Sequence, residues 1–208
     1  MHERLSPEQI REHMPRMNRD GSLMFVWRRL YAASLFREKG IRFDTRLRIC
    51  EDATFCMECF LRADGAAAIP DSLYFYRHVP GSLIRSDAYH PCMTDAMLLQ
   101  YNLKSELGER YMPQDKPELM AAMAQYTYSH IAGLIFRNLF RKTGGGKYRE
   151  FRRAVRAPIL RDMFRYLDVD AFRSKSLDWV MFKLLRMHLP VFAYGIAKYI
   201  YGKDTNDE

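Results

Sequence analysis

More than half of this chain, from residue 91 to residue 202, carries no strand pattern. Apolar residues recur there at helical spacing, as in the series Leu119, Met123, Tyr126, His130 and Leu134, which forms one broad stripe. The same region is divided by helix breakers: Pro113, Pro117, the glycines 144–146, Pro158 and Pro190. The pattern predicts helices over residues 118–142, 147–155, 159–167 and from residue 177 onward.

The first 90 residues have a mixed pattern. Ser6 and Pro7 are a good helix start, and we expect that helix to fade by Pro15. The continuous apolar residues 23–27 predict a short buried strand, and residues 66–69 and 73–76 predict either one interrupted strand or two adjacent ones. A helix should begin at Asp52 and end near Arg62. The expected fold class is α+β, predominantly helical, with residues 1–90 separate from a helical region 91–208.

The chain is basic, with a net charge of +8 and a pI near 9.4. Lysine and arginine are concentrated in residues 137–165, so nucleic acid, anionic lipid and phosphorylated substrates are candidate partners. Aromatic residues are interleaved there and could stack on bases, but their helical spacing favours a core role. These are Phe140, Tyr148, Phe151, Phe164 and Tyr166.

Four cysteines are present, and Cys56 and Cys59 have the CxxC spacing. No second pair follows, and no histidine lies at a metal-ligand spacing, so buried thiols in a reducing compartment are favoured over a zinc or redox site. The N-terminus lacks the apolar segment of a signal peptide, and a cytoplasmic location is expected.

The candidate chemistry lies in residues 41–86. Five pieces follow one another in the order Val26-Trp27-Arg28-Arg29-Leu30-Tyr31, Ile41-Arg42-Phe43, Glu51-Asp52-Ala53-Thr54-Phe55, Leu73-Tyr74-Phe75-Tyr76-Arg77 and Ser82. In this order and spacing they resemble the second half of bacterial family-2 glycosyltransferases, which have a GT-A fold. The resemblance covers residues 23–86 and implies inverting transfer of a sugar from a nucleotide-sugar to a glycan or lipid-linked acceptor in polysaccharide biosynthesis.

The resemblance assigns roles to individual residues. Asp52 matches the general base that takes the proton of the acceptor hydroxyl, and Glu51 would orient it or bind another hydroxyl. Arg77, His78 and Ser82 match the loop beside the donor diphosphate. Each role has a structural alternative, because an aspartate at a helix start is often a cap, and the stretch from Arg77 to Ser82 could be a solvated turn.

Two aromatic residues are candidates for acceptor binding. Trp27 and Tyr31 could stack on a sugar ring, although such residues more often belong to the core. The expected site is an open, sugar-sized hollow faced by the Asp52 carboxylate, with the bend of residues 76–82 at its rim.

The family's first half, with its nucleotide-binding βαβ units and metal-binding DxD, has no counterpart before residue 23. Asp168-Val169-Asp170 spells DxD but follows the acidic pair, in a region without strands, and is interpreted as a turn and cap. The complete enzyme is expected to need Mg²⁺ or Mn²⁺, whereas no metal site is predicted for this chain. We therefore expect the chain by itself to transfer no sugar.

The alternative function is a non-enzymatic basic helical module on an anionic membrane surface. Residues 179–201 are very apolar, but Lys183, Arg186, Pro190 and Lys198 interrupt them too often for a membrane span, so membrane contact through residues 174–203 is expected to be peripheral. An interfacial helix pair at the inner face of the cell membrane and packing on the preceding helices are both compatible with this pattern. Nucleic acid is the weaker alternative, and homo-oligomers are expected if the first segment exposes a face that normally meets a partner half.

Overall fold

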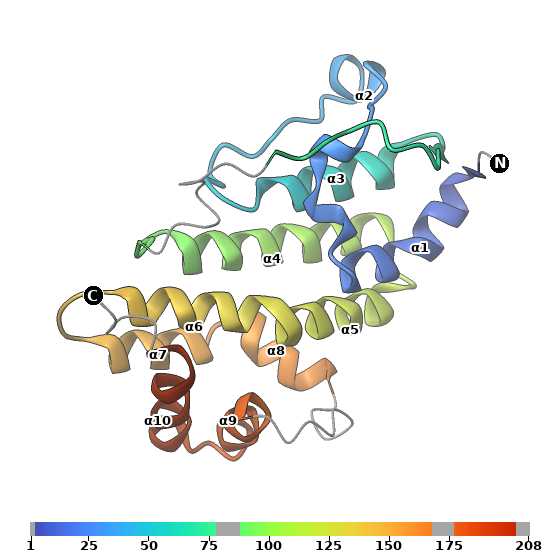
Figure 1. Cartoon of the computed structure of the whole chain (residues 1–208). Helices are drawn as coiled ribbons and strands as arrows, with labels where there is room; N and C mark the ends of the chain where they lie inside the picture. Colours follow the sequence, from blue (N-terminus) through green and yellow to red (C-terminus); the bar gives the residue numbers. More distant parts are fainter. Residues whose placement is uncertain (1–2, 78–87, 168–176, 203–208) are drawn as a thin grey trace. The chain divides into compact units, whose positions relative to one another are not determined.

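The computed structural model describes residues 3–77, 88–167 and 177–202. Helix accounts for 66% and strand for 3% of the structure, which confirms the predicted predominantly helical α+β class. Two compact units are present, and each is described by itself (Figure 1). The first consists of Met1–Ser86 and Asp95–Met123, and the second of Asp87–Thr94 and Ala124–Glu208.

The first unit contains a two-stranded antiparallel sheet, short 3₁₀ turns and helices. Glu3 pairs with Ala68, Arg4 with Ala67 and Leu5 with Ala66, so the alanine segment predicted as a strand is confirmed. Its elements are β1 (Glu3–Leu5), α1 (Pro7–Arg19), η1 (Ser22–Met24), η2 (Val26–Arg28), α2 (Ser34–Arg37), α3 (Glu51–Arg62), β2 (Ala66–Ala68), most of α4 (Met93–Tyr111) and most of α5 (Lys116–Tyr126).

Helix α1 begins with a complete capping box. The Gln9 amide donates to Ser6 Oγ at 3.3 Å, and the Ser6 amide donates to Gln9 Oε1 at 2.8 Å. The predicted end near Pro15 is wrong, because α1 continues to Arg19. Pro15 removes one helical hydrogen bond, but Ile10 and Met14 are fully buried on this helix, and their packing outweighs that loss.

Replacing Ser6 with alanine should lower the free energy of unfolding by about 1 kcal/mol, because the Gln9 amide at the start of α1 loses its side-chain acceptor. Urea denaturation measures the effect. The exposed Ser72, which begins no helix, supplies the control Ser72→Ala. Equal stability of the two variants would contradict the role of the capping box.

The predicted strand over residues 23–27 is wrong. Gly21 has a left-handed φ of 71°, and the chain then forms two 3₁₀ turns, with the Met24 amide donating to the Gly21 carbonyl and the Arg28 amide to the Phe25 carbonyl. Residues 73–76 also form no strand and are exposed. A short apolar run in a sequence can form a strand, a buried turn or a segment that packs on other side chains. It becomes a strand only where another segment pairs with its backbone.

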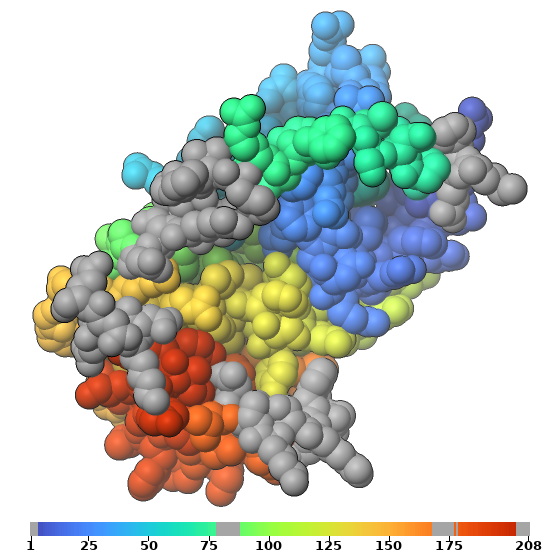
Figure 2. All heavy atoms as spheres, viewed as in Figure 1, coloured from blue at the N-terminus to red at the C-terminus, as the bar shows by residue number. Residues whose placement is uncertain are grey.

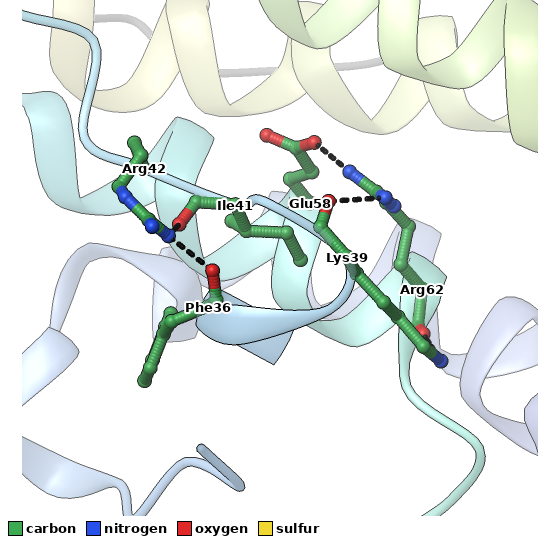
Figure 3. Close-up of polar contacts among 6 residues, drawn as sticks. All are labelled: Phe36, Lys39, Ile41, Arg42, Glu58 and Arg62. Atoms are coloured by element: carbon green, nitrogen blue, oxygen red, sulfur yellow. Dashed lines mark hydrogen bonds and ion pairs between the residues drawn. The ribbon is translucent and has the colours of Figure 1, made fainter. Parts of the chain in front are cut away.

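A polar clamp fixes the connection between α2 and α3 (Figure 3). Lys39 Nζ donates to the Arg62 carbonyl at 2.6 Å, and Arg62 Nη2 donates to the Lys39 carbonyl at 2.6 Å. Arg62 also pairs with Glu58 at 2.7 Å, while Arg42 closes the turn by donating to the Phe36 carbonyl. The end of α3 is thereby fastened to a loop more than 20 residues earlier in the chain.

The second unit is helical in its described residues. It contains the π-helical turn η4 (Thr127–Ile131), α6 (Ala132–Arg141), α7 (Lys147–Val155), α8 (Pro158–Tyr166), α9 (Leu177–Arg186) and α10 (Pro190–Tyr201). The expected helix 118–142 is interrupted by this π-helical turn, and Gly144 and Gly146 take left-handed φ angles in the loop before α7. Phe136 and Phe151 are fully buried at the centre, and Tyr201 of α10 packs on Phe136.

Within the described residues, no helix combines the length and the apolarity that crossing a membrane requires. The DxD stretch at residues 168–170 lies outside the described residues.

Candidate functional site

The acidic pair lies in the first turn of α3, as predicted, but Asp52 is not the residue that starts the helix. Cys50 occupies the N-cap with a left-handed backbone, φ 62° and ψ 21°, and Glu51 is the first helical residue. A non-glycine residue in this conformation is strained. The Gln100 side chain of α4 holds it in place by donating to the Cys50 carbonyl at 2.5 Å. Because Glu51 and Asp52 are both in the first turn, the positive end of the α3 dipole lies next to their two carboxylates.

The Asp52 carboxylate contacts a distant segment and not the amides of its own helix. Its Oδ2 accepts a hydrogen bond from the Val26 amide at 3.3 Å, across 26 residues of sequence. None of the described residues donates a hydrogen bond to Oδ1. The side chain is half-buried, and Glu51 beside it is also half-buried.

Burial raises the pKa of Asp52 above that of an ordinary aspartate, and the adjacent Glu51 raises it further. The Val26 amide and the Arg29 guanidinium act in the opposite direction, but burial is the largest influence. A carboxylate with a raised pKa is a stronger base than one in water.

An aromatic cluster is centred on the segment whose Val26 amide binds this carboxylate, and we define it as Phe25, Trp27, Tyr74 and Tyr76. The Trp27 ring stacks on Tyr74 with 4.7 Å between centroids and on Tyr76 with 5.1 Å, and Phe25 meets it edge-on. Tyr74 and Tyr76 alternate along an extended stretch, so both rings face Trp27. They remain 53% and 49% exposed, and Figure 2 shows this green stretch at the molecular surface.

Three pieces of the sequence pattern are thus brought together. Val26 binds Asp52, Trp27 stacks on Tyr74 and Tyr76, and the Tyr31 ring packs against Phe55. The segments 26–31, 51–55 and 73–76 are far apart in the chain but meet in one unit.

Tyr31 is engaged inside this unit. Its hydroxyl lies 3.1 Å from Cys56 Sγ, its ring contacts Phe36 and Phe55, and burial raises its pKa. Cys56 and Cys59 are buried on α3, which confirms their prediction as small core residues. Acceptor binding by Tyr31 stays a prediction, although the partners of its ring and hydroxyl favour a packing role.

Arg29 is a residue that the sequence analysis did not single out. It donates to the Ser22 carbonyl at 2.6 Å and to the Phe25 carbonyl at 2.5 Å, and it lies over the Phe60 ring of α3. Its Nη1 also reaches Cys56 Sγ at 3.6 Å. The guanidinium therefore fastens the 3₁₀ segment, and with it Val26, to α3. Its neighbour Arg28 is exposed and lies over Phe25 and Trp27.

The residues expected at the donor diphosphate are placed only in part. Arg77 is exposed at the end of the 73–77 stretch, whereas His78 and Ser82 lie outside the described residues. Their role stays a prediction.

The divalent cation implied by the family resemblance does not fit the residues that the structure describes. Nowhere in them do three histidine, cysteine, aspartate or glutamate side chains lie close enough to hold a metal ion. Glu51 and Asp52 are consecutive, and one Asp52 oxygen is already bound to an amide. We therefore derive no catalytic step through a metal.

The hollow described within the second unit is small, about 10 Å³, which suits about one water molecule. It is lined by residues such as Tyr89, Asn138 and Glu150, and Asp52 does not line it. The candidate site in the first unit consists of the half-buried Asp52 carboxylate and the half-exposed Tyr74 and Tyr76 rings, and the sugar-sized hollow expected there stays a prediction.

No family model, curated protein or solved structure matches this chain. The functional argument therefore rests on the side-chain arrangement around Asp52 and on the ordered sequence pattern.

Proposed function

We propose that this chain carries the acceptor-side portion of an inverting, family-2-like glycosyltransferase, with Asp52 as the general base. The observation that carries the proposal is the Asp52 carboxylate at the start of α3. One of its oxygens is fixed by the Val26 amide, none of the described residues donates to the other, and half-exposed aromatic rings lie on the adjoining segment.

In the proposed reaction, an acceptor hydroxyl oxygen attacks the anomeric carbon of the donor sugar. Its proton passes to Asp52 as the new C–O bond forms, and the bond to the donor diphosphate breaks with its electron pair on the departing phosphate oxygen. Burial raises the pKa of Asp52, which makes it the better base for this step. Glu51, next in the same turn, orients the acceptor through a second hydroxyl.

The aromatic cluster supplies the binding surface for the acceptor. Sugar rings present apolar C–H faces, and the exposed sides of Tyr74 and Tyr76 offer flat apolar area whose orientation is fixed by stacking on Trp27. Arg77 follows directly and supplies a cation for a phosphate group. A sugar bound on these rings would hold a hydroxyl beside the acidic pair.

Replacing Asp52 with asparagine should weaken binding of saccharides by about tenfold, because a hydroxyl loses its charged acceptor. Titration calorimetry with a panel of mono- and oligosaccharides measures the effect. Asp115→Asn, which changes an exposed carboxylate in the α4–α5 loop, is the control and should leave binding unchanged. Absence of saccharide binding by the unaltered chain, or equal binding by both variants, contradicts the proposal.

The folding stability of the Asp52→Asn variant distinguishes a role of Asp52 as a base from a purely structural role, in which the substitution would destabilise the fold. Because the pKa of Asp52 is raised in the folded state, the ionised carboxylate lowers stability above that pKa, and the penalty is relieved as the pH falls through it. Asp52→Asn should therefore fold with equal or greater stability at neutral pH.

Incubation of the unaltered chain with UDP- and GDP-sugars and the acceptor panel should give no product. Robust turnover would contradict the proposal that this chain is only the acceptor-side portion of the enzyme.

A further inference from the structure

Helix α10 is apolar around almost its whole circumference, with Lys198 as its one charged residue, although one side of it is exposed. Ala193, Ala197 and Tyr201 are buried on the inner side. Tyr194 contacts Phe140 and Phe151 of the helices beneath it. A helix that is apolar on all sides is normally buried on all sides. The outer side of α10 therefore presents a surface that water does not favour.

The outer side carries large side chains at helical spacing. Val191 is 62% exposed and Phe192 65%, and Tyr199 follows two turns later on the same side. The turn before the helix adds Met187, which is 65% exposed, and Leu189. We call these five residues the α10 apolar face. In Figure 2 atoms of α9 and α10, coloured orange to red, lie at the surface in this view.

Cations accompany this face. Arg186 precedes Met187 directly and is exposed, and Lys198 is exposed beside Tyr199. Lys183 lies over the Trp179 ring of α9, at 4.4 Å from its centroid. Residues 177–202 contain three lysine or arginine residues but one acidic residue, Asp178. An apolar strip with basic and aromatic residues at its border fits a layer of anionic headgroups over acyl chains.

We propose that the α10 apolar face docks on the surface of a bilayer that contains anionic lipid. The helix lies in the plane of the interface, where Phe192, Val191 and Met187 enter the acyl boundary and Arg186 and Lys198 meet the headgroups. Helix α10 has 12 residues and a length of about 18 Å, enough for an interfacial segment and too short to span. The inference is independent of the transferase proposal, since its residues belong to the second unit.

Sedimentation with vesicles tests the proposal. The full chain should pellet with vesicles of phosphatidylcholine and phosphatidylglycerol, and much less with phosphatidylcholine alone. The double variant Val191→Ser/Phe192→Ser should lower the partition coefficient by about tenfold or more, because two exposed apolar side chains no longer insert. Arg186→Gln/Lys198→Gln should remove the preference for the anionic vesicles, as should high salt.

The matched control is Leu73→Ser/Phe75→Ser, which removes two even more exposed apolar side chains from the first unit. It should pellet like the unaltered chain. The substituted residues are exposed, so circular dichroism should show unchanged helix content. The proposal is overturned if the unaltered chain ignores phosphatidylglycerol, or if both double variants pellet alike. A third result would also overturn it. If vesicle binding is absent and sedimentation velocity without lipid shows a dimer that Val191→Ser/Phe192→Ser abolishes, the α10 apolar face binds a second copy of the chain and not a bilayer.

Discussion

Replacing Lys104 with methionine should stabilise the protein by up to about 3 kcal/mol at neutral pH. Lys104 lies on α4 and is only 4% exposed. Burial lowers its pKa from 10.5 to about 8, so its ammonium group destabilises the folded state when protonated. The nearby Cys50 thiol provides no counter-charge, because its own burial raises its pKa to about 11. Methionine has a similar length and no charge to desolvate.

The pH dependence identifies the cause. With a lowered folded-state pKa, the penalty is fully present below about pH 8 and disappears as the pH rises toward 10.5, where the unfolded chain also loses the proton. Urea denaturation at about pH 6.5 and about pH 10 should show the advantage of Lys104→Met at the lower pH only. Lys116→Met, at a more exposed ion pair with Glu109, is the control and should have little effect. A variant less stable than the unaltered protein at both pH values would contradict this account.

Replacing Arg29 with methionine should destabilise the protein by about 3 kcal/mol, because charged hydrogen bonds to two carbonyls are lost together. The Ser22 carbonyl then loses its donor, the Phe25 carbonyl keeps only the Arg28 amide, and the contact with the Phe60 ring is weakened. Thermal or urea denaturation measures the change. The adjacent Arg28→Met is the control, since Arg28 is exposed and should alter stability by less than about 1 kcal/mol. Equal effects of the two substitutions would show that Arg29 does not fasten the 3₁₀ segment.

These two arginines show why the site could be predicted only in part. In the sequence they are identical neighbours, and no local pattern says which of them turns toward α3. The 3₁₀ turns of residues 22–28 determine that Arg29 faces α3 and Arg28 faces solvent. The apolar run in this segment wrongly predicted a strand. The stacking of Tyr74 and Tyr76 on Trp27 likewise depends on contacts between segments almost 50 residues apart.

Local signals were better predictors. The capping box at Ser6 and the position of the acidic pair at the start of α3 follow from neighbouring residues, and both are confirmed. Cys50 is different, because a left-handed cysteine has no sequence signature and is held by Gln100 from another helix. Pro15 shows that a strong local signal can also fail. It predicts the end of α1, but the helix continues through it because the residues around it are buried.

The location of bound saccharide tests the central claim most directly. In a nitrogen-15-labelled sample titrated with the best-binding sugar of the panel, the proposal predicts shifts of the Val26 and Asp52 amides, the Trp27 indole and the amides of residues 74–77. The same shifts should be lost in Asp52→Asn while the remaining spectrum is preserved. Saccharide-induced shifts that fall elsewhere and leave Asp52 and Trp27 unmoved would contradict the assignment of this carboxylate as the base of a sugar transferase.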